Sequence, residues 1–71
     1  MIQIGYYYQA ETPQGVRTIK CMQFDDNGNP YGIYSPSNCV NEGDNQGMVI
    51  PENSLEASIE ESEAWNIWYN S

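Results

Sequence analysis

Basic side chains are nearly absent from this sequence. Arg17 and Lys20 are the only two, histidine does not occur, and ten acidic residues give a formal net charge of -8. A compact chain with this charge repels itself and attracts basic surfaces. Nine of the acids follow Lys20 with no basic residue among them: Asp25, Asp26, Glu42, Asp44, Glu52, Glu56, Glu60, Glu61 and Glu63.

These absences exclude several classes of function. Without histidine, the usual general base near neutral pH and the Ser–His and Cys–His nucleophile pairs are missing. Two cysteines alone do not supply the four ligands of a typical zinc site. Direct nucleic-acid binding lacks its basic footprint, and an anionic membrane surface would repel the chain. We therefore expect a protein that is not an enzyme and that uses no metal, cofactor, nucleic acid or membrane.

Long apolar runs are missing as well. The longest apolar stretches are only a few residues, far short of the roughly 20 needed to span a bilayer. No basic segment followed by an apolar run marks a signal peptide. We expect a cytoplasmic protein, and this setting favours reduced thiols at Cys21 and Cys39 over a disulfide between them.

The length predicts one small domain over residues 1–71. Leucine occurs once, at Leu55, so we expect aromatic side chains to form much of the core. Tyr6 and Tyr8 are predicted to be core residues, whereas Tyr7 covers the other face of a sheet. The nine aromatics are Tyr6, Tyr7, Tyr8, Phe24, Tyr31, Tyr34, Trp65, Trp68 and Tyr69.

Alternation of apolar and polar residues predicts a hairpin at the start of the chain. Residues 1–10 and 16–24 form its strands, and the turn between them contains Pro13 and Gly15. One face of the first strand is apolar: Ile2, Ile4, Tyr6, Tyr8 and Ala10.

A second turn is centred on Asn27-Gly28, which supplies the positive φ angles of a tight hairpin. Residues 31–34 then form a third strand, residues 35–47 a loop, and residues 48–50 a candidate edge strand. The predicted fold class is α+β: a three- to four-stranded antiparallel meander with one C-terminal helix packed on it.

The C-terminal segment, residues 53–69, has two interpretations. As a helix it is capped by Asn53, with Glu56 at the third helical position of a capping box. As strands it alternates around a hairpin turn at residues 60–63, which contains no good turn former. We favour the helix, whose apolar stripe comprises Leu55, Ile59, Trp65 and Tyr69.

The acids of this segment are the main candidate site. On a continuous helix, Glu56, Glu60 and Glu63 lie on one face, about one helical turn apart along the axis, like a row of backbone phosphates. Trp68 lies off the apolar stripe and is a further candidate contact. The predicted partner-binding residues are Glu56, Glu60, Glu61, Glu63 and Trp68, with a second patch of Asp25, Asp26, Glu42 and Asp44.

A calcium site at the second turn is not supported. Asp25, Asn27 and Asn29 match the start of a calcium-binding loop, but Pro30 stands where glycine is required. Pro36 stands where the bidentate glutamate is needed. These residues are predicted to form a polar hairpin turn.

In size, acidity and Asn-, Tyr- and Glu-rich composition, the whole chain resembles the small acidic proteins that phages make against host defences, including anti-CRISPR proteins and DNA mimics. The resemblance implies stoichiometric inhibition. The partner would be a basic nucleic-acid-binding host protein, such as a CRISPR-Cas effector, in the bacterial cytoplasm.

The alternative is a small non-catalytic interaction module or virion assembly component. Such a protein would bind through its sheet edge and its aromatic side chains, and a homodimer is one form that this alternative takes. Substitutions at Trp68 or in residues 48–50 would then affect binding more than substitutions of the acids.

Overall fold

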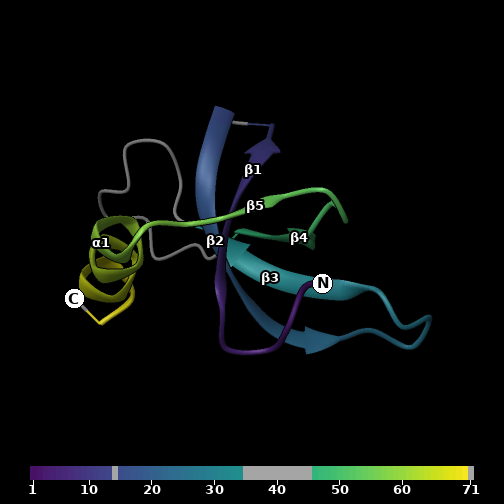
Figure 1. The fold of residues 1–71 in the computed structure, drawn as a ribbon. Coiled ribbons are helices and arrows are strands. Elements are labelled where there is room, and N and C mark those ends of the chain that lie inside the picture. Colours follow the sequence, from purple (N-terminus) through teal and green to yellow (C-terminus); the bar gives the residue numbers. More distant parts are fainter. Residues whose placement is uncertain (14, 35–45, 71) are drawn as a thin grey trace.

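A computed structural model describes residues 1–13, 15–34 and 46–70, and shows one antiparallel sheet with a helix beside it (Figure 1). The strand order in the sheet is β4-β3-β2-β1-β5. The predicted α+β class is confirmed, with five strands rather than three or four. The elements are β1 (Tyr7–Thr12), β2 (Gly15–Phe24), β3 (Pro30–Tyr34), β4 (Gln46–Val49), β5 (Leu55–Glu56) and α1 (Ile59–Tyr69).

The first four strands form the expected meander. At the second turn, Gly28 has a φ of 84°, and its N–H donates to the carbonyl of Asp25 at 2.9 Å. This confirms the predicted hairpin and the positive φ at Gly28, but the turn is centred on Asp26-Asn27 rather than on Asn27-Gly28, because its hydrogen bond joins Asp25 and Gly28. Gln46 and Gly47, which were expected to lie in a loop, belong to β4, because they pair with Tyr34 and Ile33 across the sheet.

The main core lies on one face of the sheet. Its members are Ile2, Tyr8, Ala10, Ile19, Cys21, Tyr34 and Ile50, and Met48 packs against them. The predicted apolar face of residues 1–10 is correct for Ile2, Tyr8 and Ala10, but wrong for Ile4 and Tyr6, which are 56% and 49% exposed.

The reason is a bend before β1. Gly5 has a φ of 90°, and the N–H of Tyr6 donates to the carbonyl of Gln3. The strand therefore begins only at Tyr7, and the alternation of the first six residues does not continue that of β1.

The helix is shorter than predicted. Ser58 rather than Asn53 caps α1, and the third helical position is Glu61 rather than Glu56. Residues 55 and 56 instead pair with Gln9 and Tyr8 as β5 at the edge of the sheet. Leu55 and Ile59, expected in the buried stripe, are 76% and 77% exposed. Backbone pairing with β1 and the complete capping box at Ser58 decide this boundary.

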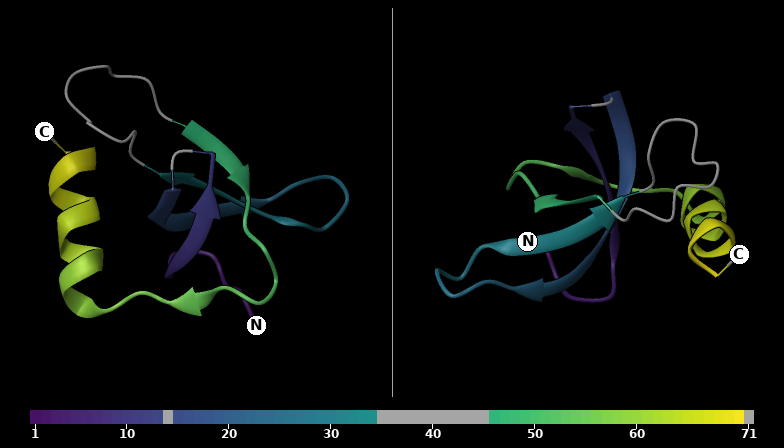
Figure 2. Two further views of the ribbon diagram at one scale, coloured as in Figure 1. Left: turned by 90° about the horizontal axis from the view of Figure 1, so that it is seen from above. Right: turned by 180° about the vertical axis from the view of Figure 1, so that it is seen from behind.

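The helix and the β2–β3 turn lie at opposite ends of the molecule in the views of Figures 1 and 2. The Cα extents are 31 × 24 × 21 Å. Within the described ranges, no helix has the length and apolar character required to cross a membrane.

Candidate functional site

The helix is held to the sheet by an aromatic cluster on the face opposite the main core. Trp65 is 4% exposed, and its Nε1–H donates to the carbonyl of Ile33 at 2.9 Å. Its ring meets that of Tyr7 edge-on at 5.6 Å, and the Tyr7 hydroxyl donates to Oδ1 of Asn66. One large side chain thus anchors an otherwise exposed helix.

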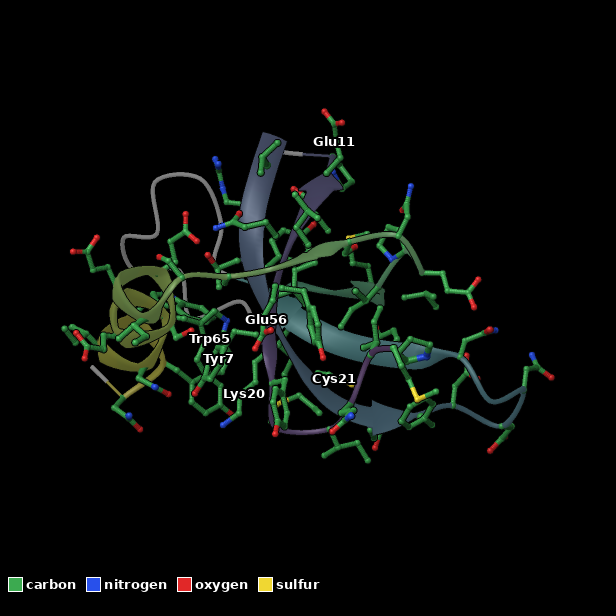
Figure 3. All side chains as sticks on the ribbon, viewed as in Figure 1. Tyr7, Glu11, Lys20, Cys21, Glu56 and Trp65 are labelled. Carbon is green, nitrogen blue, oxygen red and sulfur yellow. The ribbon has the colours of Figure 1, made fainter. Side chains whose placement is uncertain are left out.

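The two basic side chains are directed to neutral partners. Lys20 Nζ lies 5.3 Å from the ring centroid of Tyr7 and 5.5 Å from that of Trp65, so its charge is held by cation–π contacts (Figure 3). Arg17 donates from Nη1 to the carbonyl of Val16 at 2.9 Å. In the described part of the chain, Lys20 therefore contacts two aromatic rings, and Arg17 contacts a backbone carbonyl.

Almost all the carboxylates that the structure describes face solvent. Seven of the eight in the described ranges are exposed, and Asp25 is half-buried. Since Lys20 and Arg17 contact rings and a carbonyl rather than these acids, the exposed carboxylates of the described ranges are not neutralised by local ion pairs.

An open groove of about 430 Å³ lies beside this attachment, between one face of α1 and strands β1 and β2. Four residues of α1, within about 100° around the helix axis, line one wall: Glu61, Ala64, Trp65 and Trp68. Gln9 of β1 and Val16, Arg17 and Thr18 of β2 line the other. Only Trp65 of the helical four is buried, and the short side chain of Ala64 contributes to the open space.

Glu61 connects the cap of the helix to this groove. Its Oε1 accepts the backbone N–H of Ser58 at 2.8 Å, while its own N–H donates to Ser58 Oγ. The hydrogen bond from Ser58, aided by one with the Gln9 side chain, lowers the pKa of Glu61. The carboxylate is therefore ionised at neutral pH.

The predicted row of three acids on one helix face is wrong, because Glu56 lies in β5. Glu60 and Glu63 remain neighbours on α1, about 4.5 Å apart along the axis. Ile67 lies within about 60° of both around the helix and is 72% exposed. We call Glu60, Glu63 and Ile67 the solvent face of α1. Sequence reasoning missed Ile67, although its spacing from the two acids indicated this position.

The second predicted patch is distant from the first. Asp26 is exposed at the β2–β3 turn, whereas Asp25 Oδ1 accepts the backbone N–H groups of Asn27 and Asn29. Asp25 thus stabilises the turn itself. Glu42, Asp44 and Cys39 lie outside the described residues.

The aromatic predictions are partly confirmed. Trp65 and Tyr8 are buried, but Tyr69 is 42% exposed rather than core, because it stacks on the outer side of Trp65 at 4.8 Å. Trp68 is half-buried beside the groove. Within residues 1–13, 15–34 and 46–70, no three His, Cys, Asp or Glu side chains are grouped to hold a metal ion.

Comparison with known proteins gives no relative. No family model, curated protein or solved structure matches this chain. The geometry of the chain itself therefore carries the functional argument.

Proposed function

We propose that this protein is a stoichiometric, non-catalytic inhibitor of a bacterial defence protein, such as a CRISPR-Cas effector. It acts in the bacterial cytoplasm and occupies a basic nucleic-acid-binding site with its acidic surface. The observation that carries the proposal is the exposure of seven described carboxylates while both basic side chains are held by neutral groups. Uncompensated charge of this kind accelerates encounter with a basic surface.

The solvent face of α1 is the contact surface that we favour. Two carboxylates flank an exposed isoleucine, so the face combines charge with an apolar group. A basic nucleic-acid-binding groove would pair with Glu60 and Glu63, and burial of Ile67 would add apolar contact. Glu56 on β5 and Asp26 at the distant turn would extend the contact across a large basic surface.

A salt-graded capture followed by nucleic-acid displacement tests this function. The protein is immobilised on a resin and incubated with bacterial lysate, and the nucleoproteins that it captures are identified. Each of them is then purified with its nucleic acid. We expect the partner to be lost as salt rises, and the free protein to displace the nucleic acid at a one-to-one ratio. The double variant Glu60→Lys/Glu63→Lys should weaken displacement at least about tenfold.

Glu11→Lys is the matched control. Glu11 is exposed and lies at the end of β1, away from α1 (Figure 3). We expect this variant to displace nucleic acid nearly as well as the parent protein. If binding survives the double reversal with the same salt dependence, the acidic-surface proposal fails.

One observation favours the alternative, a protein-interaction module. Leu55, Ile59 and Ile67 are each more than 70% exposed, although burial of aliphatic side chains is favourable. Light scattering after size exclusion distinguishes a homodimer from a monomer. A dimer lost in Ile67→Ser or Leu55→Ser, but unaffected by charge reversal, would support the alternative over the inhibitor.

A further inference from the structure

The groove between α1 and β2 is lined by side chains that suit a cationic ligand. A carboxylate, Glu61, and a half-buried indole, Trp68, line the same space. A guanidinium group is planar, stacks on aromatic rings and pairs with carboxylates, so these two groups suit it better than a compact ammonium. The volume of about 430 Å³ is at the lower end of small-ligand sites, which run from about 300 to 1,000 Å³.

We infer that this groove receives an arginine side chain of the basic partner, with its guanidinium between the Glu61 carboxylate and the Trp68 indole. The inference rests on the proposed function, which makes the partner basic, and it adds a specific anchor. Exposed acids of α1 would attract the partner over a distance, whereas the groove would hold one of its side chains.

Two features of the structure support an arginine here. First, the neighbouring indole of Trp65 already takes part in a cation–π contact with Lys20, so this aromatic cluster accommodates positive charge. Second, the Ser58 N–H fixes one oxygen of the Glu61 carboxylate at 2.8 Å, which orients the group before a ligand arrives. A preoriented acceptor lowers the entropic cost of binding.

Arg17 opposes this binding, because its positive charge also lines the groove. Its Nη1 donates to the carbonyl of Val16, which keeps part of the guanidinium engaged. The net effect is still attractive, since the chain has a formal charge of -8. Removing the opposing charge with Arg17→Gln should therefore tighten arginine binding about two- to fivefold.

A titration with N-acetyl-arginine amide tests the inference. The chain has two tryptophans, so NMR shows two indole N–H signals, and a ligand at Trp68 should shift that signal more than the signal of Trp65, which is only 4% exposed. At about 20 mM NaCl we expect saturable shifts of the Trp68 signal with a dissociation constant of about 1 mM. N-acetyl-lysine amide should bind about threefold or more weakly.

Two variants locate the binding. Ala64→Leu fills the groove with a good helix former and should weaken binding at least about tenfold. Glu61→Gln keeps a capping-box residue at the third helical position but removes the charge, and should weaken binding about three- to tenfold. Glu63→Gln, on the solvent face of α1, removes the same charge outside the groove and should change affinity less than about twofold.

Several outcomes would overturn the inference. Equal weakening by Glu63→Gln and Glu61→Gln would show attraction by total charge only. Unchanged binding in Ala64→Leu would place the ligand elsewhere, and stronger binding of N-acetyl-glutamate amide would make Arg17 the recognition group. The titration uses no partner protein, so its failure leaves displacement of nucleic acid as a separate result. Displacement without arginine binding would reject only the groove.

Discussion

At the residue scale, Lys20 affects both the packing of the helix and the charge of the surface. It is one of two basic side chains, yet it lies over the rings of Tyr7 and Trp65 rather than beside an acid. This contact stabilises the attachment of α1 and leaves the carboxylates uncompensated. A single residue thus links the packing of the helix to the charge of the surface.

Cys21 should make the stability of the protein fall in alkaline solution. The thiol is fully buried and belongs to the main core. Burial raises its pKa, so the unfolded chain loses this proton at a lower pH than the folded one. The stabilisation is present below the pKa of the unfolded thiol and is lost as pH rises through the folded value.

Urea denaturation against pH measures this effect. Two proteins are compared, both of which carry Cys39→Ser. One retains Cys21, and the other carries Cys21→Ala. From about pH 8.5 upward, the free energy of unfolding of the protein with Cys21 should fall more steeply than that of Cys21→Ala, by up to about 1.4 kcal/mol per pH unit. Parallel stability curves from neutral to alkaline pH would contradict the prediction.

Gly32 lies at a position where the surrounding atoms leave no room for a side chain. A Cβ at this position would meet Cγ2 of Ile19, the carbonyl oxygen of Lys20 at 2.5 Å and Cδ1 of Ile50 at 3.0 Å. Ile19 and Ile50 are almost completely buried, and Lys20 O is backbone, so little can move aside. Gly32→Ala should reduce the free energy of unfolding by about 1–3 kcal/mol in thermal or urea denaturation.

Gly47→Ala is the comparison for this prediction. The three atoms nearest to a Cβ there all belong to the end of the Tyr31 side chain, which is partly exposed and can turn away. The cost should therefore be smaller than at Gly32. Equal losses at the two positions would show that the crowding around Gly32 is relieved by movement of the strands.

At the scale of elements, the boundary between β5 and α1 changes the acidic site most. The N–H of Ala57 donates to the carbonyl of Tyr7, so the chain stays paired with β1 until just before the helix. Ser58 and Glu61 then satisfy each other's backbone N–H groups. This arrangement removes Glu56 from the helix and leaves Glu60 and Glu63 as its outward acids.

Removal of the cap tests this boundary. Ser58→Ala deletes the side-chain acceptor for the Glu61 N–H and should cost about 1 kcal/mol of stability. Asn53→Ala, at the exposed position once predicted as the cap, should change stability by less than about 0.5 kcal/mol. Urea denaturation followed by far-ultraviolet circular dichroism measures both. A larger loss for Asn53→Ala would place the start of the helix earlier.

At the scale of the whole molecule, the acids occupy both ends of a small body. The first turn of α1 and the β2–β3 turn lie at opposite ends, and the Cα extents do not exceed 31 Å. At low ionic strength the screening length is comparable, about 30 Å at 0.01 M. Repulsion therefore acts across the entire protein when salt is low.

Salt should consequently stabilise the fold. Between about 0.01 and 0.5 M NaCl we expect a gain of about 1 kcal/mol, which is a rise in melting temperature of about 4–8 °C. The variant Glu11→Gln/Glu52→Gln/Glu63→Gln removes three exposed charges and should show a smaller rise. Equal rises in the two proteins would attribute the effect to salting-out of apolar surface.

The sequence alone determined the sign of the surface, the α+β class and the hairpin between β2 and β3 with its positive φ at Gly28, because charge and turn chemistry are local properties. It also indicated Trp65 as a buried anchor. Only the tertiary structure decided that Glu56 belongs to a strand, that Tyr69 is exposed, and that Glu61 and Trp68 share a groove. These outcomes depend on pairing of β5 with β1 and on packing of α1 against β2, which are contacts between residues distant in the chain.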